Sequence, residues 1–254
     1  MPYRNTLFYA AAAFALIGAS PAFAQIAAGD IYVRADLGIS GATNGNFHNR
    51  NQPVVNPLNT VTGITGTLSD LGSGWVAGIG GGLHILPNVR ADLVYTYRGS
   101  FSLDEGDQAV PPNRFQANVS SNSVMATGYW DFPLVGQTSA YLGLGLGWAD
   151  VSMSNLSSNT GALTVNPHIA GANGIPIAPG GRSDNFAWQV TTGIAFPVAN
   201  NVLLEIFYRY FDAGHVQTPA GNVTVNGSVV GQYGGAEGAL HAHELAVSLR
   251  VPIK

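Results

Sequence analysis

The chain has 254 residues, of which 46% are hydrophobic and only 9% are charged, with a net charge of −4. About a quarter of the residues of a soluble domain are charged, so this composition indicates little surface meant for water. The absence of cysteine excludes disulfides, thiol nucleophiles and cysteine metal sites. No basic patch points to nucleic acid, and the 33 glycines and 14 prolines favour many strands joined by turns.

The N-terminal residues have the pattern of a secretory signal peptide. Arg4 supplies a positive charge, residues 7–19 form an apolar stretch, and small residues mark a cleavage site after Ala24. The apolar stretch is shorter than the roughly 20 residues that a helix needs to cross a bilayer. We expect residues 1–24 to be the signal peptide and residues 25–254 to form one mature domain.

Eight segments alternate apolar and polar residues with a period of two, which places successive side chains on opposite faces of a strand. In the first segment Ile31, Val33 and Leu37 share one face, while Arg34 and Asp36 share the other. The predicted strands are 30–40, 74–84, 89–98, 123–132, 139–149, 186–196, 202–211 and 241–253.

The connections between these segments alternate in length. We expect tight connections at 85–88, 133–138 and 197–201, and long loops at 41–73, 99–122, 150–185 and 212–240. The long stretches are rich in Asn, Gly, Ser, Thr and Pro, as surface loops are. Short turns on one side and long loops on the other characterise outer-membrane barrels. The predicted fold is therefore all-β, an eight-stranded antiparallel up-and-down transmembrane β-barrel.

Alternation alone does not separate a membrane barrel from a soluble barrel of the lipocalin type, because each has one apolar and one polar face. The polar faces here consist largely of Gly, Ala, Ser and Thr, whereas a water-facing sheet carries more charges. Basic and acidic residues on these faces are equal in number, which indicates ion pairs inside a narrow lumen. The predicted lumen network comprises Arg34, Asp36, His84, Arg90, Asp92, Arg98, Asp131, Glu205, Arg209, Glu244 and Arg250.

Aromatic residues provide a second test, since membrane barrels carry aromatic girdles at both interfaces. All four tryptophans fall on the apolar strand faces, either toward the long loops or next to the short turns. The predicted girdle has Trp75, Tyr97, Trp148, Trp188 and Tyr210 on the long-loop side, and Trp130, Phe132 and Phe196 on the short-turn side.

Four motifs follow one another along the mature chain: IYVRADLG at 31–38, RADLVY at 90–95, YLGLGLG at 141–147 and YRY at 208–210. In this order they resemble the OmpA-like eight-stranded barrel family, particularly the small surface proteins of α-proteobacteria. The resemblance implies an integral outer-membrane protein that stabilises the envelope, presents surface loops or passes small solutes slowly. Two departures are expected: no peptidoglycan-binding domain, and Ile253-Lys254 where the family often has a terminal aromatic residue.

Few residues are candidates for catalysis or metal binding, and no pairing of a nucleophile with a base is evident. His241 and His243 share one strand face, as two metal ligands would, but the register directs both toward lipid at the outer rim. His84 is assigned to the polar network rather than to base catalysis. No catalytic residue, cofactor or metal site is therefore predicted.

Two further sequence features have a simple structural interpretation. The cluster Asp104, Glu105 and Asp107 lies in a predicted loop, where we interpret it as solvated charge rather than as a cation site. The glycine runs 78–82 and 143–147 lack the helix that follows a phosphate-binding loop, so we expect them to leave room inside the barrel.

The predicted function is a structural or surface-display role in the outer membrane of a Gram-negative bacterium, with extracellular loops available for adhesion or recognition. A passive small-solute pore is the alternative, which an eight-stranded barrel disfavours because side chains just fill its interior. A lipid-modifying enzyme is the third and least favoured hypothesis. The expected partners are membrane lipid, lipopolysaccharide and a surface ligand, and we expect a monomer that does not bind nucleic acid.

Overall fold

The computed structural model describes residues 29–43, 48–49, 72–106, 114–154, 156–158, 175–178, 180–199, 202–225, 228–233 and 235–253. The predicted signal peptide, residues 1–24, lies outside these ranges. Among the residues that are described, no helix is long and apolar enough to cross a membrane.

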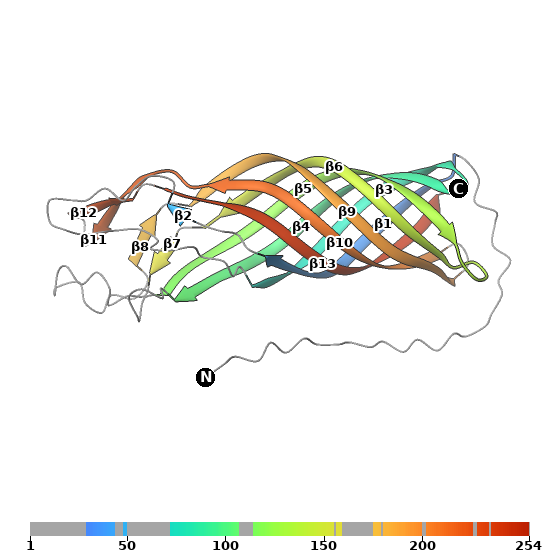
Figure 1. Cartoon of the computed structure of the whole chain (residues 1–254), viewed down its shortest axis with the longest axis horizontal. Helices are drawn as coiled ribbons and strands as arrows, with labels where there is room; N and C mark the ends of the chain where they lie inside the picture. Colours follow the sequence, from blue (N-terminus) through green and yellow to red (C-terminus); the bar gives the residue numbers. More distant parts are fainter. Residues whose placement is uncertain are drawn as a thin grey trace, which may run out of the picture.

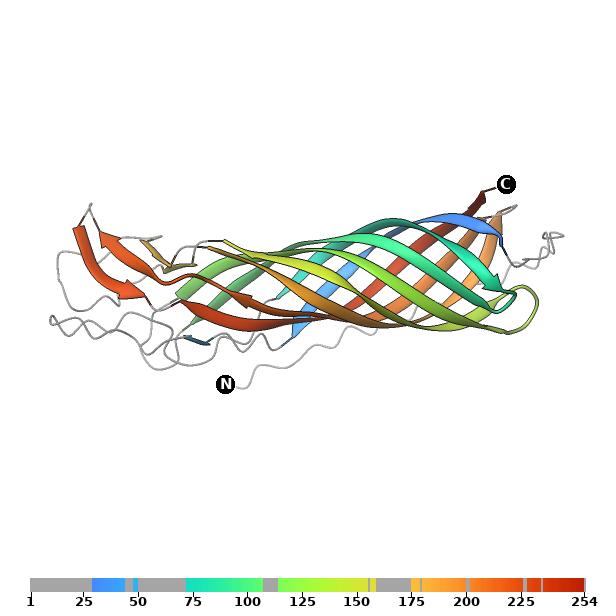
Figure 2. The same ribbon diagram turned by 90° about the horizontal axis from the view of Figure 1, so that it is seen from above.

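Eight long strands form the body of the molecule. They are β1 (Ile31–Thr43), β3 (Ser73–Leu86), β4 (Val89–Gly106), β5 (Arg114–Pro133), β6 (Ser139–Met153), β9 (Gly181–Ala199), β10 (Val202–Gln217) and β13 (Ala236–Ile253). Their antiparallel order is β4-β3-β1-β13-β10-β9-β6-β5, and β5 pairs with β4 to close the ring. Figures 1 and 2 show these tilted strands wrapping around one axis. The predicted eight-stranded antiparallel barrel is confirmed.

Five short strands accompany the barrel: β2 (His48–Asn49), β7 (Leu156–Ser158), β8 (Ile175–Ala178), β11 (Gly221–Val225) and β12 (Ser228–Tyr233). β2 pairs with β13, β7 with β5, and β8 with β7, while β11 and β12 form a separate two-stranded sheet. All five lie at the left end of Figure 1, opposite the end at which β13 finishes. The long connections therefore carry small elements of their own.

The opposite end of the barrel holds the short connections. β3 ends at Leu86 and β4 begins at Val89, so only two residues join them. The β5–β6 connection contains Gly136 with φ of 67°, a left-handed conformation that glycine adopts without a Cβ penalty. These positions agree with the predicted tight connections, although β3 extends two residues further than expected.

One continuous register links the first and last strands, from Ile31 opposite Ile253 to Thr43 opposite His241. Because side chains alternate with a period of two, this register fixes which residues face outward on both strands. Over the half of the barrel nearer the short connections, apolar side chains face outward, and Ile79 on β3 and Leu144 on β6 are each 66% exposed. In that half the outer wall is therefore apolar and the interior is polar, the reverse of a soluble protein.

The long strands continue further toward the long connections than the sequence analysis predicted. Residues assigned to loops at 99–122, 150–185 and 212–240 include the ends of β4, β5, β6, β9, β10 and β13. We call this part the distal section, formed by residues 99–106, 114–122, 149–153, 181–187, 211–217 and 236–242. The rest of the eight long strands is the proximal section.

The prediction of these strand ends was wrong for two physical reasons. The registers shift between Arg98 and Phe101 on β4 and between Asp212 and His215 on β10, so the alternation is interrupted there. Beyond those points the two faces also exchange polarity. The small polar residues of the outer face then resemble a loop in composition, although they belong to strands.

Candidate functional site

Asp92 on β4 is the centre of one group of ion pairs in the lumen. Arg34 Nη1 on β1 lies 2.6 Å from Asp92 Oδ2, and Arg34 Nη2 lies 2.9 Å from Asp36. Arg90 Nη1 approaches the same Asp92 oxygen at 3.4 Å, and the Tyr32 hydroxyl also donates to Asp92. All five side chains are buried, so each charge depends on its partners rather than on water.

Glu205 on β10 is the centre of the adjoining group. Its Oε1 lies 3.1 Å from Arg250 Nε and 3.6 Å from Arg90 Nη2, while Oε2 lies 3.7 Å from Arg34 Nη2. Tyr141 donates its hydroxyl to the same carboxylate over 3.2 Å. Three arginines from three strands thus converge on one buried carboxylate, which ties β1, β4, β10 and β13 together across the lumen.

Aromatic rings enclose this network, and the sequence analysis did not include them. The Arg90 guanidinium lies 4.0 Å from the Tyr129 ring centroid and 4.8 Å from the Tyr141 centroid, as cation–π contacts require. Tyr32 is buried on the same inward face. The alternation along the strands could have identified them, because each of these tyrosines lies on the same strand face as charged or small polar residues.

Near the short connections the network ends at Asp131 and His84. Arg90 Nε donates to Asp131 over 3.2 Å, and the Asp131 side chain is 13% exposed. His84 is buried, with its ring centroid 5.2 Å from that of Tyr32. His84 thus packs inside the barrel near the short turn.

A second polar group lies closer to the distal section and is centred on Glu244. Arg98 Nε and Arg209 Nε contact its two oxygens at 2.6 and 2.5 Å, and Ser40 donates to it over 3.2 Å. The Arg98 guanidinium also lies 3.4 Å from the centroid of the Phe211 ring. The structure therefore places the eleven predicted lumen residues inside the barrel. Ten of them take part in the ion pairs of the two groups, whereas His84 contacts the Tyr32 ring.

Glycines on the inward faces provide the space for these large side chains. A Cβ atom at Gly143 would lie 2.4 Å from the Tyr129 ring, and one at Gly82 would lie 2.5 Å from the Tyr32 hydroxyl. Real Cβ atoms do not approach other atoms so closely. The glycine runs thus accommodate the filled lumen rather than an open passage.

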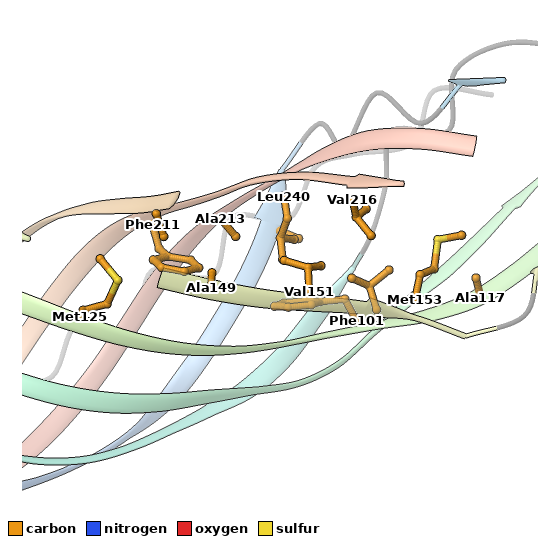
Figure 3. Close-up of a cluster of buried hydrophobic side chains, with 13 residues drawn as sticks. Phe101, Ala117, Met125, Ala149, Val151, Met153, Phe211, Ala213, Val216 and Leu240 are labelled. Carbon is orange, nitrogen blue, oxygen red and sulfur yellow. The ribbon is translucent and has the colours of Figure 1, made fainter. Parts of the chain in front are cut away.

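The distal section has an apolar interior. Thirteen buried apolar side chains form one cluster, most of which Figure 3 shows pointing inward from the strands around it. Phe101, Val119, Val151 and Leu240 are fully buried in it. Eleven members lie in the distal section, and Ala42 and Met125 adjoin it from the proximal section. The whole cluster consists of Ala42, Phe101, Ala117, Val119, Met125, Ala149, Val151, Met153, Ala187, Phe211, Ala213, Val216 and Leu240.

The outer surface of the distal section is polar. Asn118, Arg182, Asp184 and Gln217 are exposed, and Asp150 is half-buried. Arg182 donates to Asp150 across the β6–β9 pair, with the arginine side chain 72% exposed. Polar outside and apolar inside is the arrangement of a water-soluble barrel.

The eight residues of the predicted girdle all lie on outward faces. Trp75 and Tyr97 have ring centroids 5.0 Å apart, and those of Trp188 and Tyr210 are 5.3 Å apart. Toward the short turns, the rings of Trp130 and Phe132 are stacked at 6.5 Å. Trp75, Trp130, Phe132, Trp148 and Trp188 are exposed, while Tyr97, Phe196 and Tyr210 are half-buried.

The exposed apolar wall between two sets of aromatic residues is the surface expected of a membrane barrel, and comparison with known proteins gives the same result. The sequence profile of the outer membrane protein beta-barrel domain matches residues 10–247. The chain belongs to this family. It is located in the outer membrane of a Gram-negative bacterium, as its family and relatives are.

Two proteins with similar sequences are an outer-membrane protein and a candidate adhesin. The chain is 26% identical to the outer membrane protein PagN of Salmonella typhimurium over 133 residues, which are 50% of this chain and 51% of PagN. It is 29% identical to a candidate adhesin of Rickettsia conorii over 181 residues, which are 70% of this chain and 67% of that protein. The chain therefore spans about half of the length of PagN.

Among solved structures, the outer membrane protein OprG of Pseudomonas aeruginosa has the same fold. Its TM-score is 0.53 at 12% sequence identity, and the alignment covers 89% of this chain and 97% of OprG. In barrels of this family the short turns are periplasmic and the longer loops are extracellular. The distal section therefore lies on the extracellular side.

The length of the strands shows how far the distal section extends. β4 and β13 have 18 residues each. At about 3.3 Å per residue and a tilt of about 40°, such a strand rises roughly 45 Å along the barrel axis. The apolar band of an outer-membrane barrel is about 25 Å tall. Roughly 20 Å of barrel wall therefore lies outside the apolar band, at and beyond the lipid headgroups.

The two histidines singled out in the sequence lie on the outer wall, near the outer belt. Tyr208 forms a hydrogen bond with His243 Nδ1, and the Tyr210 hydroxyl lies 3.2 Å from His241 Nδ1. Asp212 Oδ2 lies 3.3 Å from the same His241 nitrogen. Throughout the described ranges, no group of three or more His, Cys, Asp or Glu residues is placed to hold a metal ion.

The acidic cluster of the sequence analysis does not lie wholly in a loop. Asp104 and Glu105 belong to β4, which corrects the predicted loop position, while Asp107 lies outside the described residues. The register pairs Asp104 with Gln116 and Glu105 with Phe115 on β5.

Proposed function

We propose that this outer-membrane protein is a surface-display protein, in which a closed barrel holds extracellular segments for adhesion or recognition. The observation that carries the proposal is the contrast between a filled lumen and a strand wall that continues outside the apolar band on the extracellular side. The short strands at the tip of this wall offer a surface at the extracellular end of the barrel. The similarity to a candidate adhesin supports the same function.

The filled lumen is an argument against the alternative of a passive pore. A solute that entered from outside would first meet the apolar cluster around Phe101 and Leu240. It would then meet the buried ion pairs centred on Glu244 and Glu205. Each layer occupies the interior, and an eight-stranded barrel has no spare width. We expect no steady conductance in planar bilayers, and sustained openings would favour the pore.

We also propose that the chain is not an enzyme. The buried acidic side chains at the centre of the lumen are engaged by arginine, as Glu205 and Glu244 illustrate. The outer imidazoles of His241 and His243 contact tyrosine hydroxyls rather than a serine or threonine. Within the described parts of the chain, these contacts leave no arrangement of a nucleophile and a base to support catalysis.

Deleting the separate two-stranded sheet at the tip tests the display function directly. Residues 221–233, which contain β11 and β12, are replaced by a short Gly-Ser linker, and bacteria that express the variant are tested for attachment to host cells. We expect attachment to fall to the level of cells without the protein. Heat-modifiable gel migration and outer-membrane fractionation must remain unchanged, which shows that the barrel still inserts. Unaltered attachment by a well-inserted variant would contradict the proposal.

A further inference from the structure

The polar group centred on Glu244, which we call the Glu244 group, has one more positive charge than negative charge. Arg98 and Arg209 each bind this carboxylate through Nε, so two guanidiniums share one acidic partner. All three residues are buried. Arginine keeps its proton in proteins, so deprotonation does not remove the surplus. A buried charge without a partner is costly, and the group therefore requires a further negative charge.

The other carboxylates of the lumen belong to the proximal network. That network has three arginines, Arg34, Arg90 and Arg250, and four carboxylates, Asp36, Asp92, Asp131 and Glu205. Its surplus negative charge is solvated at Asp131, which is 13% exposed near the short turns. Asp36 also acts on Arg209 electrostatically, but Arg34 holds its carboxylate at 2.9 Å. The surplus positive charge thus remains at the Glu244 group.

Hydrogen-bond donors around the Glu244 group are also unpaired. Arg98 Nη2 and Arg209 Nη2 are buried and have no acceptor among the residues that the structure describes. The register places Ser121 opposite Arg98 and Thr191 opposite Arg209, and both hydroxyls are buried without a partner in the same ranges. The unpaired donors therefore adjoin the two arginines that carry the surplus charge.

Apolar rings enclose the Glu244 group on two sides. Toward the distal section, the Arg98 guanidinium lies 3.4 Å from the ring centroid of Phe211, which belongs to the buried apolar cluster. Toward the proximal network, the Phe207 centroid lies 5.4 Å from the Arg209 guanidinium and 5.6 Å from that of Arg34. An ion held between these rings is shielded from water, so its attraction to the arginines is strong.

We propose that the Glu244 group binds one monovalent anion of the size of chloride, with Arg98, Arg209, Ser121 and Thr191 as its ligands. Such an ion supplies the missing acceptor and neutralises the surplus charge, whereas a water molecule supplies only the acceptor. A small ion is favoured because side chains fill the lumen of an eight-stranded barrel. The ion is enclosed, so it stabilises the barrel and does not permeate it. The proposal is independent of the display function.

The experiment compares anions during refolding, since an enclosed ion exchanges slowly with the solvent. The full-length protein from outer membranes is unfolded in urea and refolded into micelles of an uncharged detergent. The salts are sodium gluconate, chloride and sulfate at equal ionic strength, and tryptophan fluorescence gives the folding equilibrium constant. Chloride at ten times its dissociation constant should raise this constant about elevenfold over gluconate, because the ion binds only the folded state.

The anion series separates binding from a general effect of salt. In mixtures of chloride and gluconate, the logarithm of the equilibrium constant should rise with the logarithm of the chloride concentration, and the slope should approach one. Equal equilibrium constants in chloride and gluconate would overturn the proposal. An equal rise with sulfate would overturn the assignment to a monovalent ion.

A double variant assigns the effect to this site. Ser121→Ala with Thr191→Val removes two proposed ligands and keeps both arginines, so the chloride concentration needed for a given rise should increase at least about tenfold. Ser248→Ala is the matched control and should keep the parent's chloride dependence. Its hydroxyl is likewise buried without a described partner, but it lies opposite Glu205 in the proximal network. A double variant with the parent's chloride dependence would overturn the site.

Discussion

The proximal and distal sections share the same strands but place opposite residues in their interiors. β5 has Thr127 and Tyr129 buried in the proximal section and Ala117 and Val119 buried in the distal section. The backbone ladder is the same in both, so the difference follows from the surroundings. Lipid around the outer wall requires apolar residues there and leaves polar side chains for the lumen, whereas water around the wall reverses the requirement.

The two interiors are also stabilised in different ways. The proximal lumen depends on paired charges, in which the loss of one partner leaves the others buried and unpaired. The distal interior depends on apolar packing, in which the loss of a side chain leaves a cavity. Substitutions of the same type, one in each section, therefore test whether the two interiors are stabilised in these different ways.

We expect the largest effect from removing the charge on which three arginines converge. Glu205→Gln leaves Arg34, Arg90 and Arg250 without their shared carboxylate, so the free energy of unfolding should fall by roughly 3–5 kcal/mol. Urea unfolding in detergent micelles, followed by tryptophan fluorescence, measures the change. Asp184→Asn removes an acidic charge from the exposed distal wall and serves as the control. An equal decrease in the free energy of unfolding in the two variants would show that a buried lumen charge contributes no more to stability than an exposed one.

The distal interior should respond to a cavity. Phe101 is fully buried in the apolar cluster, so Phe101→Ala should lower the free energy of unfolding by roughly 3 kcal/mol. Phe186, by contrast, is 58% exposed on the outer wall, and Phe186→Ala should cost much less. The same urea titration compares the two variants. A negligible loss at Phe101 would indicate that the distal section is not packed as a core.

An arginine introduced on the outer wall distinguishes lipid from water. Leu144 and Ser152 both face outward on β6, the first in the proximal section and the second in the distal section. Leu144→Arg should cost roughly 2–4 kcal/mol because its charge faces the bilayer interior. Ser152→Arg should change the stability by less than about 0.5 kcal/mol, as surface substitutions do. Similar costs in vesicles would place the bilayer boundary elsewhere.

The same contrast explains how far the sequence alone predicts the structure. The proximal strands follow a single rule, apolar outward and polar inward, so their number, order and faces could be predicted. The distal strand ends could not, because the register shifts after Arg98 and after Asp212 and the polarity of the faces then reverses. A search for the same period with the polarity exchanged would detect such a pattern at Asn118, Val119 and Ser120.

For the lumen, strand phase indicates which residues face inward but not which ones meet. Arg98 and Glu244 are 146 residues apart in the chain and come from strands that are not neighbours in the barrel. Their contact depends on the tilt and closure of the barrel, which alternation does not encode. Nor does a period of two show that Tyr129 and Tyr141 enclose Arg90, because that contact depends on side-chain length and on the space left by Gly143.

A small effect is also expected where an ion pair of the same chemical type lies near water. The Arg182–Asp150 pair joins an arginine to an aspartate as Arg34 and Asp92 do, but the Arg182 side chain is 72% exposed. Solvent screening should limit the coupling of such a pair to less than about 1 kcal/mol. A double-mutant cycle of Asp150→Asn and Arg182→Gln measures this energy, and added salt should reduce it further. A coupling energy as large as that of the Arg34–Asp92 pair would mean that burial does not determine the difference between the two sections. The geometry of each pair would then determine its strength.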